Sequence, residues 1–503
     1  MKGVTLTALV AAYLATTSSA LYLAERTDAV PAVVGLNVQR KHVHNPAKRD
    51  LQRRQQVVSE TLDNLVRFAS ASNLPGSHTD LPQGTLYFAN VSLGTPGQSL
   101  RLHIDTGSSD LWTNAPDSKL CQNNQAPCSD SGTYDSSASS TYKLVSSDFN
   151  ISYVDGSGAL GNYATDTLSI GGQQLKGLQF GIGLRSASPE GILGIGYTSN
   201  EVQVNRNAKQ AYPNVPQYMA DNGLTKSNAY SLWLDDLEAN TGSILFGGID
   251  TDKFHGTLGT LPVQQAFGAF TQFVITLSGI SSTVNGKTQT FSQDLPTPVL
   301  LDSGSSVTYL PNDLINALYG AWNVQYDNQQ QVAIVDCKLA NSQDTVDFTF
   351  TSPKISVPAS ELVIPAGTDQ LGNTVCIFGI NPAHGTTPVL GDTFLRSAYV
   401  VYDLGNNEIS LAQTNFNATT SHVLEIGTGN NAVPSASVVA NPIQASPSET
   451  GGARIAPITA TGTGTGTGST SRPTSKSAAV SSRHMLHTAL FGISGVAAAL
   501  ALA

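Results

Sequence analysis

Two short segments of the chain place an aspartate in the same local setting. Residues 103–112 read HIDTGSSDLW, and residues 300–310 read LLDSGSSVTYL. In both, an apolar run leads to aspartate, a hydroxyl residue, glycine and two serines, so that Asp105 and Asp302 are equivalent positions 197 residues apart. A single aspartate in such a turn usually bonds its own backbone. Two matched copies instead predict a pair of carboxyl groups that act together.

A second repeated element supports this interpretation. Gly194 ends an apolar-apolar-glycine element 89 residues after Asp105, and Gly391 ends another 89 residues after Asp302. The matched spacing indicates two homologous lobes, whose symmetry would bring both carboxyl groups to the interface. Two carboxyl groups within hydrogen-bonding distance share one proton. One can then act as a base for water, and the other as an acid for a carbonyl oxygen.

The elements that must position these residues are mainly strands. Between residues 81 and 413, β-branched and aromatic runs alternate with Gly, Asn, Asp and Pro, which is typical of strands and turns. We therefore predict an all-β fold with few short helices. The clearest helix follows Pro311, where apolar residues recur at helical spacing: Leu314, Ile315, Leu318 and Trp322.

The N-terminal residues have the pattern of a secreted precursor. Residues 1–20 combine Lys2, a short apolar run and small residues, which is typical of a signal peptide and too short for a membrane anchor. Residues 21–54 hold seven bases and three acids and end in two dibasic pairs, so we interpret them as a pro-segment. Since residues 55–477 carry a net charge of −16, this basic segment could dock on the acidic body. A disordered basic arm is the alternative.

The C-terminal residues predict a stalk and a lipid anchor. The Gly/Thr/Ser-rich tract after residue 419 cannot build a core. Residues 488–503 are apolar and would form a helix of about 24 Å, short of the roughly 30 Å hydrocarbon core of a bilayer. A polar spacer and the small residues at 477–479 precede this tail, which is the order of a GPI attachment signal, and Ser477 is the predicted attachment residue. A short tail-anchor helix is the alternative.

The four cysteines of this secreted-type chain predict two disulfides, for which three pairings exist. Pairing within each half is favoured, because each bond then stays within one lobe. A metal site is not expected, since the chain has no CxxC motif and no histidine pair near these cysteines. The expected disulfides are Cys121–Cys128 and Cys337–Cys376, and the expected glycosylation sequons lie at Asn90, Asn150 and Asn417.

The motifs DTGSSDLW and DSGSSVTYL resemble the two active-site loops of the pepsin-like aspartic proteases, family A1, over residues 81–413. The segment VLGDTFLRSAYVVYDL, with the anchor signal, is similar to the fungal yapsin-like, GPI-anchored members. The resemblance implies a bilobal acid-protease fold with two β-barrel-like lobes and a cleft, and peptide hydrolysis at acidic pH by an activated water, without a cofactor. In this family two aspartates share one proton. The resemblance also implies that a pro-segment lysine, Lys41 or Lys48, pairs with these carboxylates in the zymogen. The residues that would support the loops are Thr106, Gly107, Ser108, Ser303, Gly304 and Ser305.

The segment ISYVDGSG resembles the flap, a β-hairpin that closes over the substrate. The resemblance implies that Tyr153 lies over the scissile bond with Trp112 as its partner, and that Asp155 and Gly156 form the tip. Val154 departs from the glycine that many relatives have there. The cysteine loop at 121–128 is also short and is followed by a single acid, which weakens any transfer of the yapsin preference for basic residues.

Taken together, these features predict a cell-surface endopeptidase that is made as a zymogen and is monomeric. It would be attached to the membrane or wall through a GPI lipid. Its partners would be polypeptide substrates and its own pro-segment, and no nucleic-acid partner is expected. A catalytically inactive wall-binding protein on the same fold is the main alternative. The chain lacks the GxSxG motif that is typical of many serine hydrolases. A lectin or adhesin function would not explain the paired aspartates. The physiological substrate and the subsite preferences stay open. The expected order is signal peptide 1–20, pro-segment 21–54, N-terminal lobe 81–255, C-terminal lobe 256–415, stalk 416–477 and anchor signal 478–503.

Overall fold

The structure is a computed structural model, and all of the residues that it describes lie within Met1–Ile458. The described residues are 31–44, 82–123, 126–153, 158–207, 209–239, 241–266, 268–328, 331–368 and 371–445. The predicted signal peptide, Lys48, both dibasic pairs, Ser477 and the anchor signal lie outside these ranges. Within them, no helix is long and apolar enough to cross a membrane.

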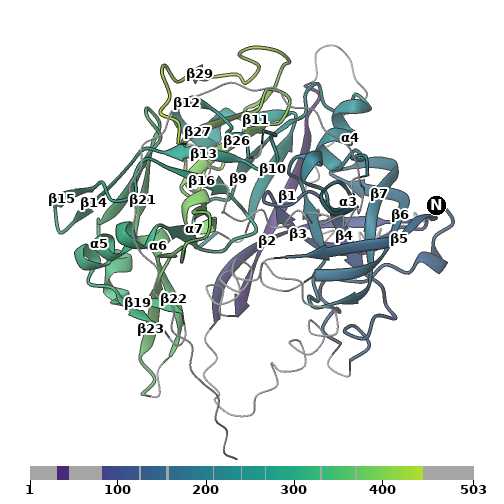
Figure 1. The fold of residues 1–503 in the computed structure, drawn as a ribbon, viewed down its shortest axis with the longest axis horizontal. Helices are drawn as coiled ribbons and strands as arrows, with labels where there is room; N and C mark the ends of the chain where they lie inside the picture. Colours follow the sequence, from purple (N-terminus) through teal and green to yellow (C-terminus); the bar gives the residue numbers. More distant parts are fainter. Residues whose placement is uncertain are drawn as a thin grey trace, which may run out of the picture. The chain divides into compact units, whose positions relative to one another are not determined.

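Most of the described chain is β-structure, as the sequence predicts (Figure 1). Figure 1 shows the strands of the first half in blue on the right and those of the second half in green on the left, with β1 (Val34–His44) between them. One 14-stranded sheet runs through both halves. Its strands, in spatial order, are β29 (Ala436–Val438), β12 (Phe254–Pro262), β27 (Glu408–Thr414), β26 (Ala398–Asp403), β9 (Ala229–Trp233), β10 (Thr241–Phe246), β1, β2 (Pro82–Leu93), β3 (Gln98–Asp105), β8 (Ile192–Gly194), β4 (Leu111–Asn114), β7 (Gln173–Ser186), β6 (Gly158–Ile170) and β5 (Lys143–Ser152).

Smaller sheets complete the fold. A two-stranded sheet pairs β11 (Gly248–Asp250) with β28 (Val423–Glu425), and a five-stranded sheet has the spatial order β13 (Val274–Leu277), β16 (Thr297–Leu301), β25 (Val389–Leu390), β17 (Thr308–Leu310) and β24 (Ile380–Pro382). One four-stranded sheet has the order β15 (Lys287–Phe291), β14 (Gly279–Val284), β20 (Thr345–Thr349) and β21 (Lys354–Pro358). The other has the order β18 (Gln325–Asp327), β19 (Val332–Val335), β23 (Thr374–Phe378) and β22 (Val363–Thr368). The α-helices of the described residues are α3 (Val202–Asn207), α4 (Val215–Asp221), α5 (Asn312–Trp322), α6 (Ala359–Leu362) and α7 (Asp392–Leu395).

The helix predicted after Pro311 is α5. It buries the expected apolar face, with Tyr319 in addition. Pro311 stands at the N-cap, where its fixed φ and missing N–H cost the helix nothing. The helix ends at Asn323, whose left-handed backbone (φ 52°) is a conformation that asparagine tolerates.

The internal repeat appears in the strand pairing. In the first half, β8 lies between β3 and β4, parallel to β3 and antiparallel to β4. In the second half, β25 lies between β16 and β17 with the same two orientations. The apolar-apolar-glycine elements of the sequence are β8 and β25 themselves. In each half, the repeated element therefore pairs with the strand before the aspartate and with the strand after it.

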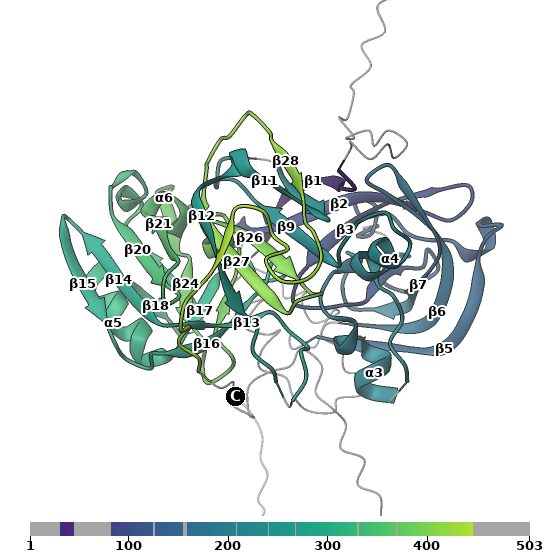
Figure 2. The same cartoon turned by 90° about the horizontal axis from the view of Figure 1, so that it is seen from above.

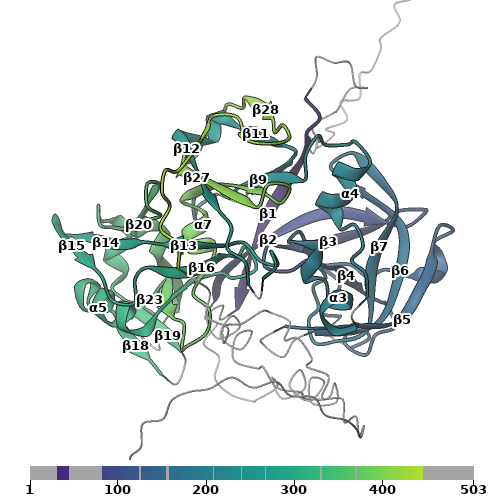
Figure 3. The ribbon, with the colours of Figure 1, turned by 45° about the horizontal axis from the view of Figure 1, so that its top comes forward.

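The predicted pro-segment contributes a strand to the main sheet. β1 lies beside β2 (Figure 3), and it pairs antiparallel with β2 on one edge and with β10 on the other. Val34, Leu36 and Val38 of this strand are buried. The Nζ atom of Lys41 lies 3.3 Å from Glu190 Oε1 and 3.6 Å from Asp130 Oδ2. The prediction that Lys41 pairs with the two aspartates is therefore wrong, because the strand register turns it toward other acids.

The stalk predicted from residue 416 begins later than expected. Residues 416–445 are folded: β28 pairs with β11, and β29 pairs with β12 (Figure 2). Ile426, Val433 and Val439 are buried, the first two in a cluster with Trp233 and Leu258. The stalk prediction is wrong for these residues, because scattered apolar side chains in a polar segment were enough to fix it to the body. The expected lobe boundary at 255/256 falls inside β12.

Candidate active site

The first repeated loop holds Asp105 at the end of β3. The carboxylate is fully buried, and its Oδ1 accepts a hydrogen bond from Gly107 N (2.9 Å) while its Oδ2 accepts one from Ser108 Oγ (2.6 Å). Hydrogen bonds to a carboxylate favour its charged form. The loop therefore fixes this aspartate in one orientation and offsets part of the cost of its burial.

The second loop repeats this geometry after β16. Asp302 is buried, its Oδ1 accepts from Gly304 N (2.9 Å), and its Oδ2 accepts from Ser305 Oγ (2.7 Å). The two loops thus match atom for atom, with distances that agree within 0.1 Å. This match is a structural counterpart of the repeated sequence motif.

The hydroxyl residues that follow the two aspartates join the loops to each other. Thr106 N donates to Ser303 Oγ (3.2 Å), and Ser303 N donates to Thr106 Oγ1 (2.9 Å). Each hydroxyl also donates into the other half, Thr106 Oγ1 to Leu301 O and Ser303 Oγ to Ile104 O, both at 3.1 Å. Since Asp105 and Asp302 directly precede these residues in the chain, the four bonds hold both aspartate-bearing backbones at one junction of the two halves.

The two repeated glycines allow the neighbouring loops to approach closely. A Cβ atom at Gly194 would lie 2.7 Å from Asp110 N, and one at Gly391 would lie 2.4 Å from Ser305 O. Real Cβ contacts are longer than this, so a side chain at either position would displace a loop that carries an aspartate. The matched spacing of 89 residues therefore reflects the same packing requirement in each half.

The predicted flap corresponds to the antiparallel hairpin of β5 and β6, whose last register pair is Ser152 with Gly158. The tip residues Asp155 and Gly156 lie outside the described residues. Tyr153 is buried, and its hydroxyl accepts a hydrogen bond from the indole Nε1 of Trp112 at 2.7 Å. This hydrogen bond ties the residue that follows β5 to β4, the strand after the first aspartate loop.

One group beside the site was missed by the sequence reasoning. Asp110 is fully buried, and its carboxylate accepts from Tyr212 OH (2.8 Å), Tyr163 OH (3.2 Å) and Val202 N (2.9 Å). It thereby links the first loop to β6, to α3 and to the segment that follows α3. The available signal was the mismatch between the two copies of the motif, because the second copy has an apolar residue at this position.

A second buried acid lies next to Asp110. Burial, and then the charge of Asp110, raise the pKa of Glu201 to about 10. Its Oε2 accepts from Tyr212 N (2.9 Å), which gives this residue a fixed place between α3 and the following segment. We infer that Glu201 is neutral wherever an acid enzyme operates, since a buried carboxyl group disfavours the charged form.

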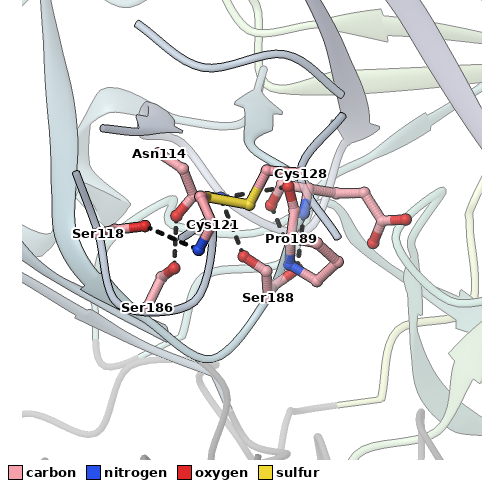
Figure 4. Close-up of a disulfide and its surroundings, with 8 residues drawn as sticks. Asn114, Ser118, Cys121, Cys128, Ser186, Ser188 and Pro189 are labelled. Atoms are coloured by element: carbon pink, nitrogen blue, oxygen red, sulfur yellow. Dashed lines mark hydrogen bonds between the residues drawn. A yellow bond between two sulfur atoms is a disulfide. The ribbon is translucent and has the colours of Figure 1, made fainter. Parts of the chain in front are cut away.

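Both predicted disulfides are present, Cys121–Cys128 and Cys337–Cys376. The first closes a short loop beside Asn114 at the end of β4 (Figure 4). Asn114 Nδ2 donates to Ser188 O (3.0 Å) and to Pro189 O (3.2 Å), which fastens this region to the segment after β7. The second disulfide joins the short helix at 337–341 to β23.

Two further predictions concern metal binding and glycosylation. Among the described residues, no group of three or more His, Cys, Asp or Glu side chains is arranged to hold a metal ion. The three sequon asparagines Asn90, Asn150 and Asn417 are exposed, which leaves room for a glycan at each.

Comparisons with known proteins agree with this geometry. The family model described as eukaryotic aspartyl protease matches residues 86–414. The chain is 53% identical over 431 residues to a probable aspartic-type endopeptidase opsB of Aspergillus fumigatus, covering 85% of each chain. It is 40% identical to secreted aspartic protease 3 of Candida albicans, covering 66% of this chain and 80% of that one. The fold resembles the crystal structure of the aspartic proteinase from Irpex lacteus, with a TM-score of 0.54 and 24% identity over 67% of this chain and 96% of the other. The chain belongs to the eukaryotic aspartyl protease family.

Proposed function

We propose that this chain is a secreted aspartic-type endopeptidase in which Asp105 and Asp302 activate a water molecule for attack on a peptide bond. The observation that carries the proposal is the set of four crossed hydrogen bonds between Thr106 and Ser303 and the backbones before them. A turn-forming aspartate needs no such brace from a second, equivalent loop. Family membership and the identity to named endopeptidases support the same reaction class.

The reaction would proceed through a dyad that holds one proton. The ionised carboxyl group removes a proton from water as the water attacks the amide carbon, and the protonated one donates to the carbonyl oxygen. The dyad titrates as a unit, so the active form exists between its two macroscopic dissociations. We therefore expect the peptidase activity to have an acidic pH optimum. Gly107 N and Ser108 Oγ would orient the first carboxylate, and Gly304 N and Ser305 Oγ would orient the second.

The flap would close the site over the substrate. Tyr153 is held by the Trp112 indole, and hairpin closure excludes water and fixes the peptide. The tip residues Asp155 and Gly156 would then contact the substrate backbone. Neither a metal nor an organic cofactor has a step in this mechanism.

The remaining features describe how the enzyme would be made and placed. We propose a precursor with a signal peptide, cleavage at the dibasic pairs between residues 48 and 54, and a GPI lipid at Ser477 that places the enzyme on the outer face of the plasma membrane or in the wall. The secreted relative in Candida albicans is named for secretion. Glycans at Asn90, Asn150 and Asn417 fit a chain that passes through the secretory pathway.

The test is hydrolysis of a quenched-fluorescence peptide library at pH 3 to 7, with and without pepstatin. We expect pepstatin-sensitive cleavage at acidic pH. Asp105→Asn and Asp302→Asn should each abolish it, with kcat lowered by about 10²- to 10⁴-fold. Both variants keep an oxygen for the glycine N–H and should fold, which circular dichroism verifies. Full activity in either variant would contradict the dyad, and a folded protein without any peptidase activity would favour a wall-binding role.

A further inference from the structure

We propose that Tyr230 and Tyr402 are positioning residues for the reaction, and that together they support the two aspartate loops from the buried side. This inference rests on the proposed function, because it gives both side chains a role in the aspartate dyad. Neither tyrosine touches the reacting atoms in this proposal. They act through the residues that join them to the backbones of Asp105 and Asp302.

The two tyrosines lie opposite each other on neighbouring strands of the main sheet. Tyr230 of β9 and Tyr402 of β26 are register partners, and both are fully buried. Their rings are stacked, with centroids 5.0 Å apart and an interplanar angle of 23°. Since β9 comes from the first half of the sequence and β26 from the second, this stack joins the two halves directly.

Tyr230 is bonded to the residue that supports the first aspartate. Its hydroxyl donates a hydrogen bond to Ile195 O at 3.0 Å, and the N–H of Ile195 donates to Asp105 O at 3.1 Å. A single residue therefore connects the tyrosine hydroxyl to the backbone of Asp105. Without the hydroxyl, the buried Ile195 carbonyl would lose this donor, which costs more than the loss of an exposed hydrogen bond.

Tyr402 is packed against the residue that supports the second aspartate. The centroid of its ring lies 4.7 Å from that of Phe273, which is also fully buried. Phe273 O accepts a hydrogen bond at 3.1 Å from the N–H of Leu301, the residue directly before Asp302. Leu301 O in turn accepts from Thr106 Oγ1. The ring of Tyr402 is thus connected to the bonds that join the two loops.

The dyad also acts electrostatically on both phenols. Burial raises the pKa of Tyr402, the Thr106 hydroxyl lowers it, and the charge of Asp302 raises it. Burial, then two neighbouring phenols, and then the charge of Asp105 raise the pKa of Tyr230. The titratable groups that face the pair, besides each other, are Asp105, Asp302, Asp392 and Tyr197. Both phenols are therefore neutral at acidic pH, and each places a polar hydroxyl near one aspartate. Because a polar neighbour stabilises the charged form of a carboxyl group, removing a hydroxyl should raise the first dissociation of the dyad.

The test compares variants of the full chain with a matched control. Tyr402→Leu removes the ring and the hydroxyl, whereas Tyr402→Phe and Tyr230→Phe each remove a hydroxyl alone. Tyr399→Phe is the control, because Tyr399 is buried on the opposite face of β26. Its hydroxyl accepts from Asp250 N (2.7 Å) and donates to Ser231 Oγ (2.8 Å), so the control also loses buried hydrogen bonds. Urea unfolding measures stability, and kcat and kcat/KM on a peptide substrate are measured from pH 3 to 7.

The expected results separate positioning from stability. Tyr402→Leu should lower kcat by about tenfold, because the loops lose their support, and Tyr402→Phe should recover most of this loss by keeping the ring stack. Tyr230→Phe should lower kcat by about three- to tenfold. Both phenylalanine variants should move the acid limb of kcat/KM to higher pH. Tyr399→Phe should lose stability and keep the kcat and the acid limb of the parent.

The phenylalanine variants keep the proposal falsifiable even if Tyr402→Leu fails to fold. An acid limb that stays at the parent position in both of them would overturn the positioning role. A loss of kcat in Tyr399→Phe as large as in Tyr230→Phe would overturn it as well, since a buried tyrosine on either face would then have the same effect.

The activity of the parent protein keeps the two proposals distinct. A folded parent without peptidase activity would overturn the proposed function, and the positioning role would fall with it. An active parent whose Tyr230 and Tyr402 variants behave like Tyr399→Phe would overturn the positioning role alone, and the proposed function would stand.

Discussion

The two aspartate loops agree at five successive positions and then diverge at the sixth. From Asp105 and Asp302 onward they share the same carboxylate contacts and the crossed hydroxyls. Five residues later the first loop has Asp110, a buried carboxylate with three donors. The second loop has Val307 there, in an apolar cluster that includes Leu300 and Tyr309.

This difference separates the part of the molecule that would do the chemistry from the part that faces the flap. The shared positions orient the two carboxyl groups that would share one proton. The divergent position serves only the first half, where Trp112 holds the flap residue Tyr153. The two loops are thus alike where the proposed reaction needs both carboxyl groups, and they differ at Asp110 and Val307, where their surroundings differ.

The largest loss of stability should come from placing an aspartate at Val307, the position in the second loop that is equivalent to Asp110. Val307→Asp would bury a carboxylate in an apolar cluster, which should lower the free energy of unfolding by about 4 kcal/mol at pH 7. Urea unfolding at pH 7 and pH 4 measures this, with a smaller loss at pH 4, where the carboxyl group is more readily protonated. Val307→Asn is the neutral control. Equal unfolding of Val307→Asp and the parent would show that this site can solvate a charge.

Glu201→Gln tests the acid pair of the first half. The pKa of Glu201 is about 10 in the folded protein against 4.5 when unfolded, so the folded state holds an extra proton between these values. The stability is complete below about pH 4.5 and falls as pH rises, by up to about 1.4 kcal/mol per pH unit. Glutamine cannot ionise, so the variant should be more stable than the parent at pH 7 by about 3 kcal/mol, and nearly equal at pH 4.

Thermal unfolding across pH 3 to 8 gives this comparison directly. Glutamine can still accept from Tyr212 N, and its amide can donate to Asp110. Parallel unfolding curves for Glu201→Gln and the parent over this range would mean that Glu201 is charged in the folded protein, contrary to our inference.

Removing the hydroxyl group of Thr106 or of Ser303 should lower the free energy of unfolding by a similar amount. Thr106→Val leaves Ser303 N buried without its acceptor, and Ser303→Ala does the same to Thr106 N, at about 2 kcal/mol each. The two substitutions remove different hydrogen bonds of one connected set, so the double variant measures how strongly the two loops depend on each other. Urea unfolding with kcat on a peptide substrate measures both effects. A large asymmetry between the single variants would show that one loop positions itself alone.

The smallest effect should come from the hydrogen bond between Trp112 and Tyr153 in the first half. Trp112→Phe keeps a ring but removes the N–H that donates to Tyr153 OH, a loss of about 1 kcal/mol. We expect kcat/KM to fall about two- to tenfold. Tyr153→Phe removes the acceptor of the same bond, so adding it to Trp112→Phe should change little more through that bond. Full additivity would mean that the two side chains act separately.

The sequence was sufficient for features that depend on local pattern or on repetition. The β-rich fold and α5 follow from apolar spacing and turn residues, and the two aspartate loops follow from two motifs at equal separation. Both disulfides follow from an even number of cysteines, with each pair kept within one half. These succeed because each is specified within a short window, or is written twice. The Trp112–Tyr153 contact followed from resemblance to a family, not from pattern.

Tertiary structure alone decided the features that join distant segments. A basic segment with dibasic ends gives no sign that Val34 and Val38 complete a sheet, because the pairing partners lie at residues 82–93 and 241–246. Residues 416–445 look like the start of a stalk, yet Ile426 and Val433 lie in an apolar cluster with residues of five strands, β9, β11, β12, β26 and β27. The protonation of Glu201 likewise depends on burial beside Asp110, 91 residues away. Local pattern specifies strands and turns, whereas burial and strand partners are set only when the whole chain has folded.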